Sequence, residues 1–168
     1  LFDIDATSHN KPINFSLIGQ ITSECFMPLC YGGGVRTLDD FKKLFYLGIE
    51  KVSISSLLFE SPDIVKQAVD IYGSQSIIAT LDIKKYRFRK TYGVYTKSGT
   101  HKTPYLPIAA AEYACELGVG EIILNSVDRD GTWEGFDLGL VKSIAEVVTV
   151  PVVAAGGAGE LDDIKNVV

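Results

Sequence analysis

The chain has 168 residues, of which 46% are hydrophobic and 22% charged, the ordinary balance of one globular domain. Its formal net charge of −5 argues against nucleic-acid binding, which needs a basic surface. No apolar stretch is long enough to cross a bilayer, and the first residues lack the basic region of a signal peptide. Three cysteines without Cys-x-x-Cys spacing suit a reducing cytoplasm, and the two histidines have no second ligand at metal spacing. We therefore expect a cytoplasmic protein with no membrane contact, metal or cofactor.

Short apolar runs alternate with amphipathic stretches along the whole chain. Because these runs are rich in Ile, Val and Leu and show no polar alternation, they predict strands buried on both faces. The expected strands are Leu1–Ile4, Pro28–Tyr31, Lys51–Ser55, Ser76–Leu81, Glu121–Asn125 and Pro151–Ala154.

Helix signals lie between these strands. Thr37 is typical of the cap of a helix over Leu38–Leu47, and Ser61-Pro62 opens another over Asp63–Tyr72. Two more helices are expected at about 107–117 and after Asp137. This alternation predicts right-handed βαβ units and a parallel sheet.

One long segment, residues 84–103, interrupts the alternation and predicts an extended loop or a small hairpin. Its basic residues are most simply solvated, although they could close over an anionic ligand. They are Lys84, Lys85, Arg87, Arg89 and Lys90.

The chain contains an internal repeat. A shift of 123 residues places Pro28 on Pro151, Gly33-Gly34 on Gly156-Gly157, and Leu38-Asp39-Asp40 on Leu161-Asp162-Asp163. Two such units would make 246 residues, close to the ~250 of an eight-stranded (β/α)₈ TIM barrel. With six expected strands, residues 1–168 are predicted to form one partial barrel domain, strands two to seven, without the first and the eighth.

Two glycine turns predict phosphate sites at the carboxyl ends of the strands, where TIM barrels have their active sites. Glycines let backbone N–H groups approach an anion, and a following helix adds partial positive charge. Gly32–Gly34 precede the helix capped by Thr37, and Gly156–Gly159 precede one that starts near Leu161. A single turn of this kind would more simply be a tight turn, but two in register favour a substrate with two phosphates.

Asp82 ends an apolar strand, where burial can raise the pKa of a carboxyl group and suit it to general acid or base catalysis. The alternative is a carboxylate that caps the backbone amides of the next loop. Position alone leaves both interpretations open.

Three motifs carry a resemblance to a known family. They are Leu-Phe-Asp-Ile-Asp-Ala, Pro-Leu-Cys-Tyr-Gly-Gly-Gly-Val-Arg-Thr and Ser-Val-Asp-Arg-Asp-Gly-Thr. With them the chain resembles the cyclase subunit of imidazole glycerol phosphate synthase, a (β/α)₈ barrel of two repeated halves. The resemblance implies a lyase of histidine biosynthesis that forms a heterodimer with a glutaminase. Ammonia from the glutaminase would convert a bis-phosphate formimino ribotide to imidazole glycerol phosphate and aminoimidazole carboxamide ribotide.

The resemblance also implies roles for individual residues. Asp82 matches one of two catalytic aspartates, and the other would lie on the first strand. Lys51 and Glu121 match an ammonia gate, although charged residues at strand starts are often merely solvated. The residues implied in substrate and phosphate binding are Asp3, Gly33, Gly34, Ser55, Ser56, Asn125, Asp130, Gly131, Gly156 and Gly157.

Several positions depart from the histidine-pathway pattern, among them Cys30, Ser55 and Asn125. The stretch from Cys25 to Gly34 is closer to paralogues found with surface-polysaccharide genes, which imply amidination of an acetamido sugar with ammonia. A third hypothesis is an inactive partial barrel that only binds phosphate.

Overall fold

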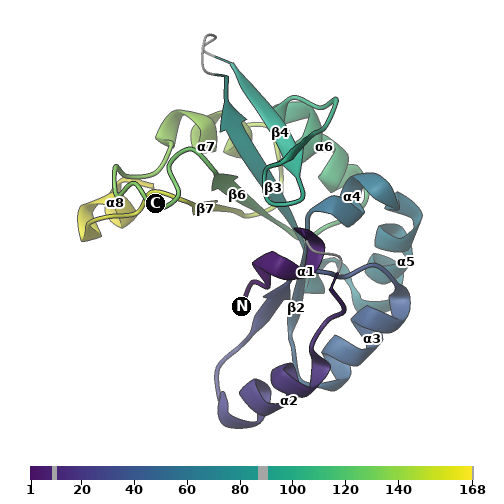
Figure 1. Cartoon of the computed structure of the whole chain (residues 1–168). Helices are drawn as coiled ribbons and strands as arrows, with labels where there is room; N and C mark the ends of the chain where they lie inside the picture. Colours follow the sequence, from purple (N-terminus) through teal and green to yellow (C-terminus); the bar gives the residue numbers. More distant parts are fainter. Residues whose placement is uncertain (9–10, 87–90, 168) are drawn as a thin grey trace.

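A computed structural model describes residues 1–8, 11–86 and 91–167. Within these residues the strands form one sheet (Figure 1). Five of the strands are parallel to one another. Two further strands pair antiparallel with the end of the third strand and form a ribbon. The parallel strands are β1 (Cys30–Gly32), β2 (Lys51–Ile54), β3 (Ile77–Lys85), β6 (Glu121–Ser126) and β7 (Val152–Ala155), and the ribbon adds β4 (Tyr92–Thr96) and β5 (His101–Lys102).

Helices flank the sheet (Figure 1): α3 contacts β2, α6 contacts β3 and α7 contacts β7. None of the helices in the described part of the chain is long and apolar enough to cross a membrane. The helices are α1 (Ile4–Ser8), α2 (Phe15–Glu24), α3 (Leu38–Tyr46), α4 (Ser56–Glu60), α5 (Pro62–Tyr72), α6 (Pro107–Glu116), α7 (Leu138–Ala145) and α8 (Leu161–Val167), with a 3₁₀ turn at Ser74–Ser76.

Side chains alternate between the two faces of the sheet. One set, including Val52, Leu81 and Leu124, is buried in the core that the helices cover. The alternate set, including Ser53 and Asn125, lines a cavity on the inner face. The alternation of side-chain direction along the strands therefore separates the residues that hold the fold together from those available for chemistry.

The predicted helix caps are confirmed. Thr37 Oγ1 accepts a hydrogen bond from the Asp40 N–H at 3.2 Å, and Asp40 Oδ2 accepts one from the Thr37 N–H at 2.9 Å. This reciprocal pair satisfies two N–H groups that the helix itself cannot pair. Asp137 caps α7, and α5 ends at Gly73, as expected.

Replacing Thr37 with alanine is expected to lower the free energy of unfolding by about 1 kcal/mol, because a helix N–H loses its acceptor. Urea denaturation of the Thr37→Ala and Thr37→Ser variants measures the effect. Serine keeps the hydroxyl and should stay close to the parent chain. An alanine variant as stable as the serine variant would contradict the capping role.

The 123-residue repeat extends to hydrogen bonds. Asn14 and Asp137 stand 123 positions apart, and each accepts from the N–H three residues further on. Asp40 and Asp163 are also 123 apart, and each accepts from the N–H groups three and four residues before it. The two halves therefore start their helices in the same way.

The same shift relates strand pairing. Phe2 forms a parallel bridge with Gly32, and Asn125, 123 positions after Phe2, pairs with Ala155. In the first half of the repeat, the start of the chain therefore pairs with β1, as β6 pairs with β7 in the second half.

The predicted strand Leu1–Ile4 is wrong in extent. Phe2 makes a single bridge, and Ile4 already belongs to α1. The reason lies in Asp3, whose Oδ1 accepts from the N–H groups of Asp5 and Ala6 at 3.1 and 3.0 Å. This side-chain acceptor turns the chain into a helix directly after the bridge.

The other strand boundaries move by one or two residues, except that β3 runs on to Lys85. Its extension forms the ribbon with β4 and β5, which confirms the small hairpin predicted in residues 84–103. His9, Arg87, Arg89 and Lys90 lie outside the described residues. In the described part the sheet is open, with β1 and β7 at its edges, so strands two to seven of a barrel remain a prediction.

Candidate functional site

A cavity of about 600 Å³ lies at the carboxyl ends of the parallel strands. The end of each parallel strand contributes to its lining, as do the segment before α1 and the turn between β4 and β5. The predicted site residues that line it are Asp3, Gly33, Gly34, Ser55, Ser56, Asp82, Asn125, Asp130 and Gly156. Gly131, Gly157, Lys51 and Glu121 lie outside the lining.

Asp82 is a buried carboxyl group in this cavity, with 9% of its surface exposed. It pairs with Asn125 across the parallel strands β3 and β6, and the Asn125 amide donates to Asp82 Oδ1 at 2.8 Å. Burial raises the pKa of Asp82, and the negative charge of Asp130 adds to the rise. The Asn125 hydrogen bond and the charge of Lys84 lower that pKa in part.

This environment bears on the two interpretations of Asp82. In the described part of the chain its hydrogen-bond donor is the Asn125 side chain, not a backbone N–H of the following loop. The loop-capping alternative therefore loses its support. A buried carboxyl whose pKa is raised by burial and whose oxygen is oriented by an amide is suited to proton transfer.

The two glycine turns are built alike. Gly33 has φ +124°, and a Cβ there would lie 2.4 Å from the Asp3 carbonyl oxygen. Gly156, its repeat partner, has φ +83°, and a Cβ there would lie 2.6 Å from the Ser126 carbonyl oxygen. Close approach of two backbone segments therefore requires glycine at both places. The close backbone contacts explain the two glycines without a ligand, and they are also compatible with a bound phosphate. Phosphate binding at these turns remains a prediction.

Ser55 carries an unsatisfied group at the edge of the first glycine turn. Its Oγ is buried, with no hydrogen-bond partner among the described residues, and the residue lines the cavity. Because buried hydroxyls are nearly always paired, such a group in a cavity wall is suited to a ligand. Next to it, Ser56 Oγ accepts from the Lys97 N–H at 3.3 Å.

Lys51 and Glu121 form an ion pair at the other end of the inner face. Glu121 stands four residues before Asn125 on the same face of β6, which separates the two by ~13 Å along the strand. The Glu121 side chain is 17% exposed, whereas that of Lys51 is 43% exposed, so the carboxylate is largely buried while the ammonium still reaches solvent. Cys30 pairs with Lys51 in the strand register, and burial raises the pKa of its thiol.

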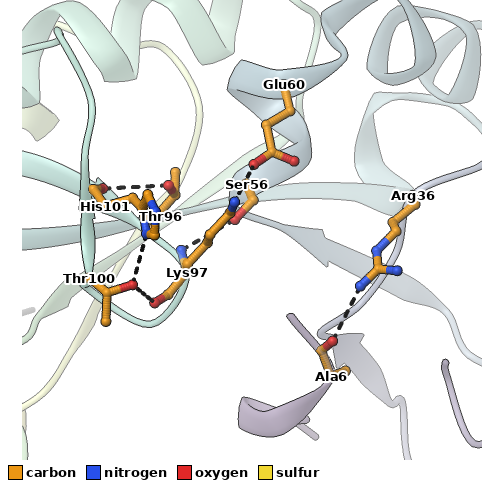
Figure 2. A network of polar contacts seen from close by, with 8 residues as sticks. All are labelled: Ala6, Arg36, Ser56, Glu60, Thr96, Lys97, Thr100 and His101. Carbon is orange, nitrogen blue, oxygen red and sulfur yellow. Dashed lines mark hydrogen bonds and ion pairs between the residues drawn. The ribbon is translucent and has the colours of Figure 1, made fainter. Parts of the chain in front are cut away.

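Sequence reasoning missed the turn between β4 and β5 as part of the site. Lys97 and Ser98 in this turn line the cavity, together with Glu60 from α4 and Arg36. Figure 2 shows Lys97, Glu60 and Arg36 with their polar contacts. The Lys-Ser-Gly-Thr run marks a turn, but its position over the cavity depends on the hairpin. The described residues contain no group of three or more His, Cys, Asp and Glu side chains arranged to hold a metal ion.

Comparison with known proteins places the chain in a family. The sequence profile of a family described as "Histidine biosynthesis protein" matches residues 1–168. The chain is 44% identical over 164 residues to the "Putative imidazole glycerol phosphate synthase subunit hisF2" of Pseudomonas aeruginosa, covering 98% of this chain and 65% of that protein. It is 39% identical over 166 residues to the imidazole glycerol phosphate synthase subunit HisF of Leptospira biflexa, covering 99% of this chain and 65% of that protein.

The chain belongs to the histidine biosynthesis protein family. The resemblance inferred from the three motifs is thereby confirmed. Histidine biosynthesis proteins of this family are TIM barrels, and the parallel strands and flanking helices of the chain follow that α/β architecture. The chain spans 65% of the length of these two relatives, and over that span the sheet is open.

Proposed function

We propose that the chain is the ammonia-using cyclase part of an imidazole glycerol phosphate synthase. The observation that carries the proposal is the buried Asp82 carboxyl, held by Asn125 in a cavity between two repeat-related glycine turns. A cavity with a buried carboxyl group between two glycine turns that could each bind an anion suits a long substrate with a phosphate at each end. Residues 1–168 would form strands two to seven of the barrel.

Asp82 serves as the acid or base in this proposal. Ring formation by ammonia and bond cleavage both require protons to move between nitrogen atoms, and a buried carboxyl can carry them. Asn125 fixes one carboxyl oxygen, which leaves Oδ2 to face the substrate. The second catalytic aspartate implied by the family would lie on the first strand of the barrel.

The two phosphates would bind at the glycine turns. Gly34, Ser55 and Ser56 hold one of them. The Ser55 hydroxyl, which has no hydrogen-bond partner among the described residues, would form a hydrogen bond with this phosphate. Asp130 is near the other, with Gly131 and Gly157 supplying N–H groups. Asp3 lines the cavity close to the first turn.

Ammonia would enter from the opposite end of the strands, past Lys51 and Glu121. Their ion pair lies at the end of the strands away from Asp82, which supports a gate at that position. A glutaminase subunit docked at that end would deliver ammonia without exposing it to bulk water. A heterodimer of this kind is therefore part of the proposal.

A second acceptor is favoured by the residues that line the cavity. Ser55 and Asn125 depart from the usual histidine-pathway residues, and both contribute to the lining. Asn125 also makes the hydrogen bond to Asp82. A changed residue at this point favours a changed acceptor, for which the candidate is an acetamido sugar: ammonia nitrogen bonds to the acetamido carbon, and the carbonyl oxygen leaves as water to give an amidine.

Turnover with an ammonium salt separates these functions. The gene-length protein is incubated with ammonium and either the bis-phosphate ribotide or an acetamido sugar, and products are followed by mass spectrometry. The proposal predicts imidazole glycerol phosphate from the ribotide. Amidine formation with no ribotide turnover would favour the sugar, and no reaction of either by a folded protein would favour a phosphate-binding partial barrel.

A further inference from the structure

The turn between β4 and β5 has an unusual backbone. Lys97 and Ser98 have φ values of 52° and 55°, and Gly99 follows with 75°. Non-glycine residues rarely adopt this left-handed conformation, and two in succession are held only where surrounding contacts fix them. The backbone conformation of this turn is therefore fixed by its contacts with the rest of the fold.

Three hydrogen bonds fix the turn at the cavity. The Lys97 N–H donates to Ser56 Oγ at 3.3 Å, and Ser98 Oγ donates to the Ile4 carbonyl at 3.4 Å. Behind the turn, Lys84 Nζ donates to the Gly99 carbonyl at 2.5 Å. The turn therefore joins the start of α4 to the start of α1.

The Lys97 side chain lies along the same wall of the cavity. It runs past Ser56 to Glu60, where Nζ is 3.6 Å from Oε1 (Figure 2). The two side chains are 40% and 56% exposed, so water screens the pair and the contact is weak. A stronger anion could therefore displace Glu60 at small cost.

Carboxyl groups outnumber basic side chains in the cavity lining, so an anionic ligand there would need a cation beside it. Four carboxyl groups line it, and its lysine and arginine residues are Arg36 and Lys97. Arg36 donates to the Ala6 carbonyl at 3.3 Å and so is engaged with the segment around α1. A phosphate monoester would bring up to two further negative charges into this cavity. Lys97 is the other lining cation: its backbone N–H donates to Ser56 Oγ, and among the described residues its ammonium makes only the exposed pair with Glu60.

We infer that Lys97 is an anion-binding residue of this site, which leaves Glu60 and pairs with a substrate phosphate held at Gly34, Ser55 and Ser56. The inference rests on the proposed function, because it takes the first glycine turn as a phosphate site. When no phosphate is bound, the Glu60 carboxylate pairs with Lys97 and keeps its side chain along the cavity wall. The turn thereby selects substrates with a dianionic group at that end.

Site-resolved titration tests the inference. The 168-residue chain labelled with ¹⁵N is titrated with inorganic phosphate, and dissociation constants are read separately from the Ser56 and Gly156 amide signals. Lys97→Asn removes the charge, and asparagine tolerates the left-handed backbone, so the turn should survive. It is expected to weaken binding at Ser56 by about three- to tenfold and leave Gly156 unchanged.

Companion variants sharpen the test. Lys97→Arg should restore most of the affinity at Ser56, and Glu60→Gln should strengthen binding there by about two- to threefold, because the competing carboxylate is gone. Lys142 on α7 and Glu146, the residue that follows this helix, form a comparable exposed pair with Nζ 3.8 Å from Oε1, so Lys142→Asn and Glu146→Gln serve as matched controls.

The outcomes separate the two claims. If the parent chain binds phosphate at Ser56 and Lys97→Asn binds equally well, the role of Lys97 is wrong while the phosphate site stands. If the Ser56 signal of the parent chain does not respond to phosphate, the site itself is wrong, and the inference falls with it.

Discussion

Replacing Asp82 with asparagine is expected to lower ammonia-dependent turnover by about 10²- to 10⁴-fold, the usual contribution of a positioned general acid or base. Asparagine has nearly the same shape but cannot transfer a proton. The rate with saturating ammonium salt is the measurement, because it bypasses any glutaminase partner. Asp70→Asn, an exposed carboxyl on α5, is the matched control and should keep full activity.

Asp82→Asn should not lower stability at neutral pH. Burial raises the pKa of Asp82, so the folded protein favours the protonated carboxyl, and stability falls as pH rises from the ordinary aspartate value through the raised one. The Asp82→Asn variant has no carboxyl group to ionise at this position, so its stability does not fall in this way as the pH rises. Its Tm relative to the parent should therefore be higher at pH 8 than at pH 3. A variant that unfolds more easily at pH 8 would show that the carboxylate itself supports the fold.

Replacing Gly33 with alanine is expected to cost ~3 kcal/mol or more in the free energy of unfolding, the range of strong backbone strain. A Cβ there would meet the Asp3 carbonyl oxygen at 2.4 Å, and φ is +124°. Backbone atoms cannot move aside as a side chain can. The outcome would be a large drop in the urea midpoint and loss of the Phe2–Gly32 bridge.

Gly131→Ala is the matched control for this prediction. Gly131 also has a positive φ, +75°, but a Cβ there meets no atom within 4 Å. Only the left-handed backbone then opposes alanine, which costs about 1–2 kcal/mol. Equal losses at Gly33 and Gly131 would mean that the conformation, and not the close approach to Asp3, makes glycine necessary at the first turn.

Local signals in the sequence predicted much of the fold. Thr37, Pro62 and Gly73 mark helix ends because caps and φ restrictions act within a few residues. The helix α2 was not predicted, although its repeat partner α7 was: both contain a glycine and one charged residue, so only the preceding Asp137 marked α7. The bend after Phe2 depends on one Asp3 side chain, which periodicity cannot reveal.

The site was predicted where it depends on strand ends and missed where it depends on a hairpin. Asp82, Asn125 and Ser55 follow directly from strand ends in a parallel sheet. Lys97 does not, because the ribbon of β4 and β5 places it over the cavity through antiparallel pairing with β3. The Asp82–Asn125 hydrogen bond likewise requires the register between two strands, which sequence alone does not fix.

The central claim is that two repeat-related turns each bind a phosphate across one cavity. The most direct measurement is a crystal structure of the chain soaked in phosphate. The account predicts one anion beside Gly33 and Gly34 within hydrogen-bond distance of Ser55 Oγ, and a second beside Gly156 and Gly157. Crystals that show no anion at either turn, with the cavity open to solvent, would contradict it.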